Sequence, residues 1–176
     1  MDDNYDLTKL RKKPSRKNSR AKGHGFERQI AKLLNDRFNT KEFSRSPGSG
    51  AFATTHTLPE HLKIYGDLIT PNKFKYCIEC KKGYNNQNLY SLYNYSSEFW
   101  GFINQCEKDS KKCYKIPMVI FKQDRQPTLA IVPDHVQFGD QYKSIQISKK
   151  KDGFIIRYNI YLFESILDSY DALWME

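Results

Sequence analysis

Residues 64 to 81, IYGDLITPNKFKYCIECK, decide the fold that we predict for this chain. They divide into two segments, 64–70 and 73–81, separated by Pro71-Asn72, a pair typical of a turn. In the second segment apolar and more polar side chains alternate, and this period of two is typical of a β-strand. The stretch therefore predicts two strands that pair as an antiparallel hairpin.

A hairpin centred near Asn72 would bring two carboxylates together. Its symmetry sets Asp67 opposite Cys77, and Glu79 then lies on the same face as Asp67, two residues beyond Cys77. Diagonal neighbours on one face of a sheet lie roughly 7–8 Å apart, so both carboxylates can reach one cation. Lys81 lies on that face as well, one pleat further along.

This arrangement is suited to phosphodiester hydrolysis. Converging carboxylates repel one another unless a cation lies between them, and their oxygen ligands favour Mg²⁺ or Mn²⁺. Such a metal polarises a phosphate and lowers the pKa of a bound water. An ammonium such as that of Lys81 orients the water or stabilises charge on phosphorus. We therefore expect Asp67, Glu79 and Lys81 to be catalytic with Mg²⁺, for which Mn²⁺ would substitute.

A helix is predicted from Lys22 to Phe38. Its apolar residues fall on one stripe with the 3.6-residue period of a helix, and they are Phe26, Ile30, Leu33 and Leu34. Glu27 lies at the rim of this stripe. We therefore expect its carboxylate to point inward over the sheet edge as a third acid, which binds metal directly or through water.

The rest of the chain predicts a second helix and further strand pairs. The helix begins with Ser96 or Ser97 as cap and turns apolar residues inward, namely Phe99, Phe102, Ile103 and Cys106. Strand pairs are predicted at 116–122 with 128–132 and at 144–148 with 153–160, and a closing helix at 162–174. The order predicts an α/β fold with a small mixed β-sheet flanked by helices, in a single domain over residues 22–176.

The charge balance indicates a polyanion as partner. The chain has 29 Lys and Arg against 20 Asp and Glu, a net charge of +9, and nucleic acid is the commonest polyanion. The segment up to Lys22 holds eight of the basic residues and three aspartates. We expect residues 1–21 to form a disordered arm that contacts phosphates. A solvated tail without a role is the alternative.

No stretch has the roughly 20 apolar residues that a membrane span needs, and the N-terminal residues lack the apolar core of a signal peptide. We therefore expect a cytoplasmic protein with no membrane partner, whose four cysteines are free thiols. High usage of Lys, Asn, Tyr and Ile is typical of an AT-rich coding sequence, as in a phage or a low-GC bacterium. The expected location is thus a bacterial or phage-infected cell.

Several short motifs together resemble one known family. In chain order they are Lys22-Gly23, Phe26-Glu27-Arg28, Arg45-Ser46, Gly66-Asp67 and Ile78-Glu79-Cys80-Lys81. The set resembles the archaeal-type Holliday junction resolvases of the PD-(D/E)XK nuclease superfamily over residues 22–82. The chain departs from the pattern in Gly66, which stands where the pattern has Pro but which many superfamily members also tolerate, in a longer segment at 51–64, and in the Asn- and Tyr-rich segment 84–95.

The resemblance implies a restriction-endonuclease-like core and an activity on branched DNA. It implies that Glu27, Asp67 and Glu79 bind divalent metal with help from the backbone carbonyl of Cys80, and that Lys81 serves the attacking water. The residues expected to contact DNA are Arg28, Arg45, Ser46, Ser49 and Lys82. It also implies a homodimer, because a four-way junction needs two symmetric cuts.

Other interpretations remain open. The same centre would serve a restriction-like, nicking or mobile-element nuclease, and a basic nucleic-acid-binding protein would use Asp67 and Glu79 only structurally. A zinc site at the four cysteines is disfavoured, because Cys77 and Cys80 would face opposite sides of a strand. For the tyrosines at 90, 93 and 95 we favour packing over the core edge against stacking on unpaired bases.

Overall fold

The computed structural model describes residues 19–47 and 65–176. Its elements are α1 (Ser19–Phe38), β1 (Ser44–Arg45), β2 (Leu68–Ile69), β3 (Tyr76–Lys82), η3 (Leu89–Leu92), α3 (Glu98–Cys113), β4 (Ile116–Lys122), β5 (Leu129–Pro133), β6 (Ser144–Lys151), β7 (Phe154–Leu162), α4 (Phe163–Ile166) and η4 (Asp171–Leu173). Most of the predicted arm, Ser49 and the 51–64 segment lie outside the described residues. No helix in the described ranges is long and apolar enough to cross a membrane.

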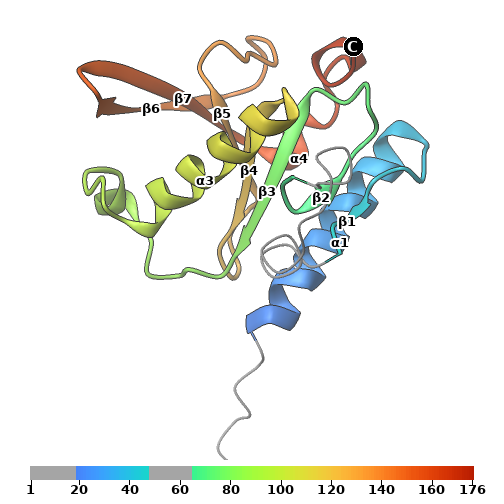
Figure 1. The fold of residues 1–176 in the computed structure, drawn as a ribbon, viewed down its shortest axis with the longest axis horizontal. Coiled ribbons are helices and arrows are strands. Elements are labelled where there is room, and N and C mark those ends of the chain that lie inside the picture. The colour runs from blue at the N-terminus through green and yellow to red at the C-terminus, as the bar shows by residue number, and fades with distance from the viewer. Residues whose placement is uncertain (1–18, 48–64) are drawn as a thin grey trace, which may run out of the picture.

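A five-stranded mixed sheet forms the centre of the fold, in the order β3-β4-β5-β7-β6. Strands β3 and β4 are parallel, with α3 as the connection between them, and the other neighbours are antiparallel. Figure 1 shows α1 and α3 on opposite sides of β3. The predicted mixed sheet flanked by helices is therefore confirmed.

Apolar side chains form one core on each face of the sheet. Along β3, Tyr76 and Ile78 join the cluster that contains the apolar stripe of α1. The other cluster joins the inward residues of α3 to Val119 and Phe121 of β4. Because side chains alternate between the faces of a strand, this division follows directly from the pattern read in the sequence.

The predicted hairpin at 64–81 is wrong in its pairing. Strand β2 has two residues and pairs antiparallel with β1, while β3 pairs parallel with β4. The residues between β2 and β3 pair with the C-terminal segment instead, because the Lys75 amide donates to the Trp174 carbonyl and Phe74 forms a β-bridge with Met175. The connection thus packs against the C-terminal segment instead of closing a tight turn.

The predicted closing helix is also wrong, because it is one turn, α4, followed by the short η4. The guanidinium of Arg37 donates to the carbonyls of Leu167 and Ser169, and the buried Trp174 indole donates to the Ser169 hydroxyl at 2.8 Å. These contacts take up the carbonyls at the end of the turn and fold the chain back into the core. A continued helix could not place Trp174 there.

Candidate active site

Asp67 lies beside the edge of the sheet formed by β3. Its amide donates to the Ile78 carbonyl at 2.8 Å, and its carboxylate accepts from the Cys80 amide at 2.8 Å. On its other side the Ser46 amide donates to the Asp67 carbonyl at 2.9 Å. The Asp67 backbone is therefore held on both sides, and its buried carboxylate is fixed by the Cys80 amide.

Gly66 makes this approach possible. Its φ of +77° lies in the left-handed region, and a Cβ atom there would lie 2.6 Å from the Ile78 carbonyl oxygen. A residue with a side chain would therefore push the Gly66-Asp67 segment away from β3. This position therefore needs glycine in this chain.

Glu79 and Lys81 project from β3 beside Asp67. Glu79 is 1% exposed, and its carboxylate accepts a hydrogen bond from the Lys81 ammonium. Burial, and after it the charge of Asp67, raise the pKa of Glu79 to about 7 against the opposing effect of Lys81. Burial lowers the pKa of Lys81, but the Glu79 carboxylate outweighs it, so the net shift is upward and the ammonium stays charged.

Glu27 reaches the same place from α1. Its side chain is buried, as the sequence predicted, and it accepts a hydrogen bond from the Arg45 Nε at 2.7 Å. Burial raises its pKa, Asp67 adds to this, and Arg45 opposes it. Because Asp67 acts on both glutamates, the three carboxylates form one electrostatic unit.

The donor set fits a divalent cation. Among the described residues, the buried Glu27 and Glu79 carboxylates each pair with one cation, Arg45 and Lys81, and hard oxygen donors favour Mg²⁺ or Mn²⁺. Within residues 19–47 and 65–176, no three ligand side chains yet converge on one point. The physical reason is that both glutamates are turned toward a cation, so a metal would take over the contacts that these cations now make.

Cys80 has one group available to such a metal. Burial raises the pKa of its thiol well above the usual value, so the sulfur stays protonated. Its amide points to Asp67 at the sheet edge, and the amide and carbonyl of one strand residue point the same way. The Cys80 carbonyl therefore faces the edge where Asp67 lies.

The described residues that we predicted to contact DNA differ in their exposure and in their hydrogen-bond partners. Arg28 is exposed on α1, and Lys82 is half-buried with its ammonium 5.6 Å from the centre of the Phe26 ring. The guanidinium of Arg45 is occupied by Glu27. Ser46 is buried and donates to the Gly66 carbonyl at 3.1 Å, so its hydroxyl supports the Asp67 segment.

Gln105 is a site residue that our sequence analysis missed. Its side-chain oxygen accepts from the Lys81 ammonium at 3.3 Å, and the Phe102 ring lies 5.5 Å from that ammonium. Phe102, Gln105 and Cys106 are spaced as neighbours on one helix face, so the period of α3 was the signal. The sequence pattern of α3 does not show that this face packs against β3, where Lys81 lies.

Two comparisons with known proteins give the family of the chain. The family model described as "Phage putative PDDEXK endonuclease" matches residues 18–175. Protein D14 of Escherichia phage T5 is 33% identical over 155 residues, which cover 83% of this chain and 89% of that protein. No solved structure gives a significant match. The chain therefore belongs to the phage PDDEXK endonuclease family, within the PD-(D/E)XK nuclease superfamily.

Proposed function

We propose that this nuclease is a Mg²⁺-dependent DNA endonuclease that cuts branched DNA as a homodimer inside the bacterial host cell. The observation that carries the proposal is the buried cluster of Glu27, Asp67 and Glu79 beside the Lys81 ammonium. A site with a net excess of buried carboxylates and one adjacent ammonium is suited to metal-assisted phosphodiester hydrolysis.

Each residue has a role that its contacts support. Asp67, held by the Cys80 amide, would be the fixed metal ligand, and Glu79 and Glu27 would complete the set with the Cys80 carbonyl. The bound metal would polarise the scissile phosphate and lower the pKa of a water. Lys81, once released by Glu79, would orient that water or stabilise charge on the phosphate, and Gln105 would hold its ammonium in place.

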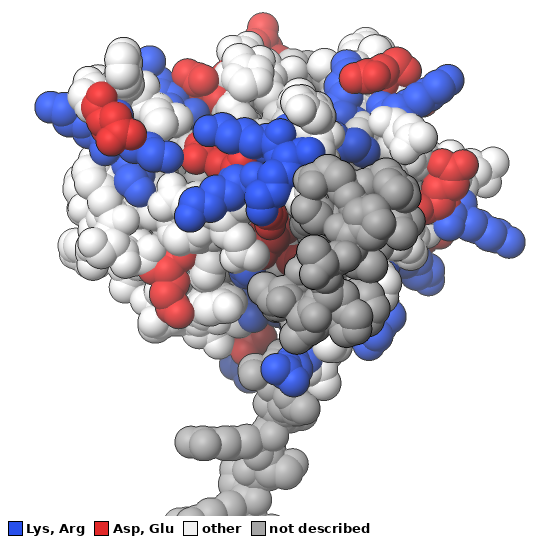
Figure 2. All heavy atoms as spheres, in the orientation of Figure 1, with Lys and Arg blue, Asp and Glu red and all other residues white. Residues whose placement is uncertain are grey.

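Positive charge on the surface supports DNA as the substrate. Figure 2 shows Lys and Arg side chains gathered near α3 on the face drawn there, and the exposed lysines of that helix are Lys108, Lys111 and Lys112. Together with Arg28, Lys82 and the eight basic residues up to Lys22, they would contact phosphates without reading sequence.

The resolvase-like motif order favours a branched substrate and a pair of active sites. The test compares a synthetic four-way junction with linear duplex, in Mg²⁺ and in EDTA, together with the molar mass in solution. Paired symmetric nicks in the junction, absent in EDTA, and the mass of a dimer are expected. Cleavage of linear duplex at an equal rate would rule out the branched-DNA proposal and leave a general nuclease. Binding without cleavage in Mg²⁺ or Mn²⁺ would leave a binding protein.

Metal binding should become stronger as the pH rises through 7. Glu79 has a pKa near 7 in the folded chain against 4.5 ordinarily, so the folded state retains a proton that the unfolded state has lost. Without metal, stability should therefore fall as the pH rises from 4.5 to 7. Mg²⁺ requires the ionised carboxylate. A fixed Mg²⁺ concentration, about 100 times the Kd measured at pH 8, should raise Tm by roughly 5–10 °C at pH 8. The same concentration should raise Tm much less at pH 5.5, where Glu79 is protonated and the Kd is higher.

Thermal melts with and without Mg²⁺ at the two pH values measure this difference. The Glu79→Gln variant should show a smaller fall in stability and a weaker pH dependence of the Mg²⁺ effect, because its side chain does not titrate and only Glu27, whose pKa is also raised, still contributes. An equal Mg²⁺ effect at both pH values in the wild type would contradict a metal ligand role for Glu79.

A further inference from the structure

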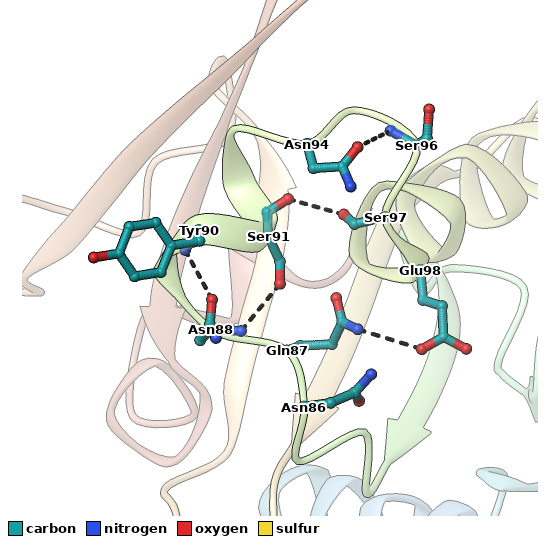
Figure 3. A pocket seen from close by; sticks show the side chains of 9 residues that line it. All are labelled: Asn86, Gln87, Asn88, Tyr90, Ser91, Asn94, Ser96, Ser97 and Glu98. Atoms are coloured by element: carbon teal, nitrogen blue, oxygen red, sulfur yellow. Dashed lines mark hydrogen bonds between the residues drawn. The ribbon is translucent and has the colours of Figure 1, made fainter.

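A shallow surface cavity of about 530 Å³, open to solvent, lies between the segment that follows β3 and the start of α3 (Figure 3). It is lined by Asn86, Gln87, Asn88, Tyr90, Ser91, Asn94, Ser96, Ser97 and Glu98. Its volume falls in the range of roughly 300–1,000 Å³ found for small-molecule sites. None of these residues belongs to the carboxylate cluster.

The lining selects the kind of ligand. Among the lining residues the only charge is the Glu98 carboxylate, with no Lys or Arg, so a phosphate would be repelled. A single carboxylate is also too few for a metal site. Amide and hydroxyl groups make up nearly all the rest, and amides present a donor and an acceptor together. A neutral planar ligand with donors and acceptors on its edge fits this lining, and a nucleobase is such a ligand.

Several of these polar groups have unused hydrogen-bonding capacity. Gln87 positions the Glu98 carboxylate, to which its amide nitrogen donates at 3.3 Å, while its own side-chain oxygen is buried without a partner among the described residues. The side-chain oxygens of Asn88 and Asn94 each accept from a backbone amide, which leaves their NH₂ groups free to donate. Among the described residues, the cavity therefore offers the NH₂ groups of Asn88 and Asn94 as donors and the Glu98 carboxylate as an acceptor to a base edge.

Exposed tyrosines stand beside the cavity. The predicted packing of the three tyrosines over the core edge is wrong for Tyr90 and Tyr93, which are 82% and 85% exposed. Tyr95 does pack, with its ring centre 5.8 Å from that of the buried Trp100. Trp100 is the buried aromatic residue next to this segment, and its indole donates to the Leu92 carbonyl at 3.0 Å. Figure 3 shows the Tyr90 ring turned outward from the rim. It is free to stack on a base that neighbours one held in the cavity.

The cavity is held firmly and lies close to the candidate active site. The Gln123 amide donates to the carbonyls of Tyr84 and Gln87, and Asn88 caps η3 in a reciprocal pair with Ser91. Along α3, Glu98 is seven residues from Gln105, which contacts Lys81. That separation is roughly 10 Å along the helix axis, or about three stacked base steps.

We propose that this cavity binds one unpaired nucleobase of the substrate, with Tyr90 as the stacking platform for its neighbour. The inference rests on the proposed function for the identity of the substrate as DNA. An extrahelical or single-stranded base is available at branches, bulges and ends, and it exposes the edge and face that a paired base hides. The cavity would thus give the enzyme its preference for DNA that is not fully paired.

Fluorescence polarisation in EDTA tests the proposal with two labelled probes, a paired duplex and the same duplex with a single unpaired adenine. The full chain should bind the bulged probe roughly tenfold more tightly, and Gln87→Ala and Tyr90→Ala should each remove most of that preference. Affinity for the paired duplex should stay unchanged. The matched controls are Gln137→Ala and Tyr114→Ala, since both residues are exposed and lie outside the cavity.

Equal affinity of the wild type for the two probes would overturn the proposal. So would an equal loss of affinity for both probes in Gln87→Ala or Tyr90→Ala. Cleavage of the same probes in Mg²⁺ is measured in parallel. A protein that prefers the bulge but cleaves nothing would refute the proposed function and keep this inference. A protein that cleaves DNA but shows no preference for the bulged probe would refute this inference and keep the nuclease activity.

Discussion

Asp67→Asn is expected to lower the rate of metal-dependent DNA cleavage by roughly 10³-fold or more, because it removes several kcal/mol of metal-mediated stabilisation of the transition state. The amide keeps the size of the side chain and can still accept from the Cys80 amide, so the fold should persist. What it loses is the negative charge that acts on Glu27 and Glu79. Single-turnover cleavage with saturating enzyme measures the effect on chemistry separately from binding.

Asp140→Asn is the matched control, since this aspartate is exposed and remote from the carboxylate cluster, and it should cleave like the wild type. Both variants should melt within a few degrees of the wild type and bind DNA in EDTA. An Asp67→Asn protein that binds and cleaves normally would remove Asp67 from the active site.

Gly66→Ala is expected to reduce cleavage by roughly 100-fold, because a catalytic group displaced by about 1 Å loses activity on that scale. The new Cβ would meet the Ile78 carbonyl oxygen at 2.6 Å and the Cys77 sulfur at 3.1 Å. The left-handed conformation adds a strain of about 1–3 kcal/mol. The segment must therefore move, and the bonds that position Asp67 move with it.

The comparison with Gly101→Ala isolates this effect. Gly101 lies on the exposed side of α3, where an added Cβ meets nothing within 4 Å, so alanine should stabilise the helix by about 1 kcal/mol. Urea unfolding and single-turnover cleavage are measured on both proteins. Full activity in Gly66→Ala would show that Asp67 does not depend on its close approach to β3.

The sequence predicted which acidic side chains turn inward better than the path of the chain between them. The alternation along β3 and the stripe of α1 were sufficient to turn Glu79 and Glu27 inward, because both depend on local periodicity. Asp67 meets Glu79 for another reason than the one predicted. A hairpin register was expected, but β3 pairs with β4. Asp67 is held beside β3 by one hydrogen bond to the Ile78 carbonyl and one from the Cys80 amide.

The failures have a common physical cause, which is long-range pairing. The C-terminal segment has an apolar helical pattern, but Arg37 and Lys75, far away in the sequence, take its backbone carbonyls. Tyr90 and Tyr93 were predicted to pack over the core edge because tyrosine side chains usually pack. Trp100 is the buried aromatic residue next to this segment, and its indole donates to the Leu92 carbonyl. Local pattern does not reveal which of several apolar groups occupies a shared place in the core.

The measurement that tests the central claim most directly is a crystal structure of the chain soaked in Mn²⁺, with data collected for anomalous scattering. We expect a peak within coordination distance of the Asp67 and Glu79 carboxylates and the Cys80 carbonyl, with the Lys81 ammonium turned away from Glu79. No anomalous peak at this cluster, with Glu79 still bound to Lys81 at saturating Mn²⁺, would contradict a metal-dependent nuclease centre here.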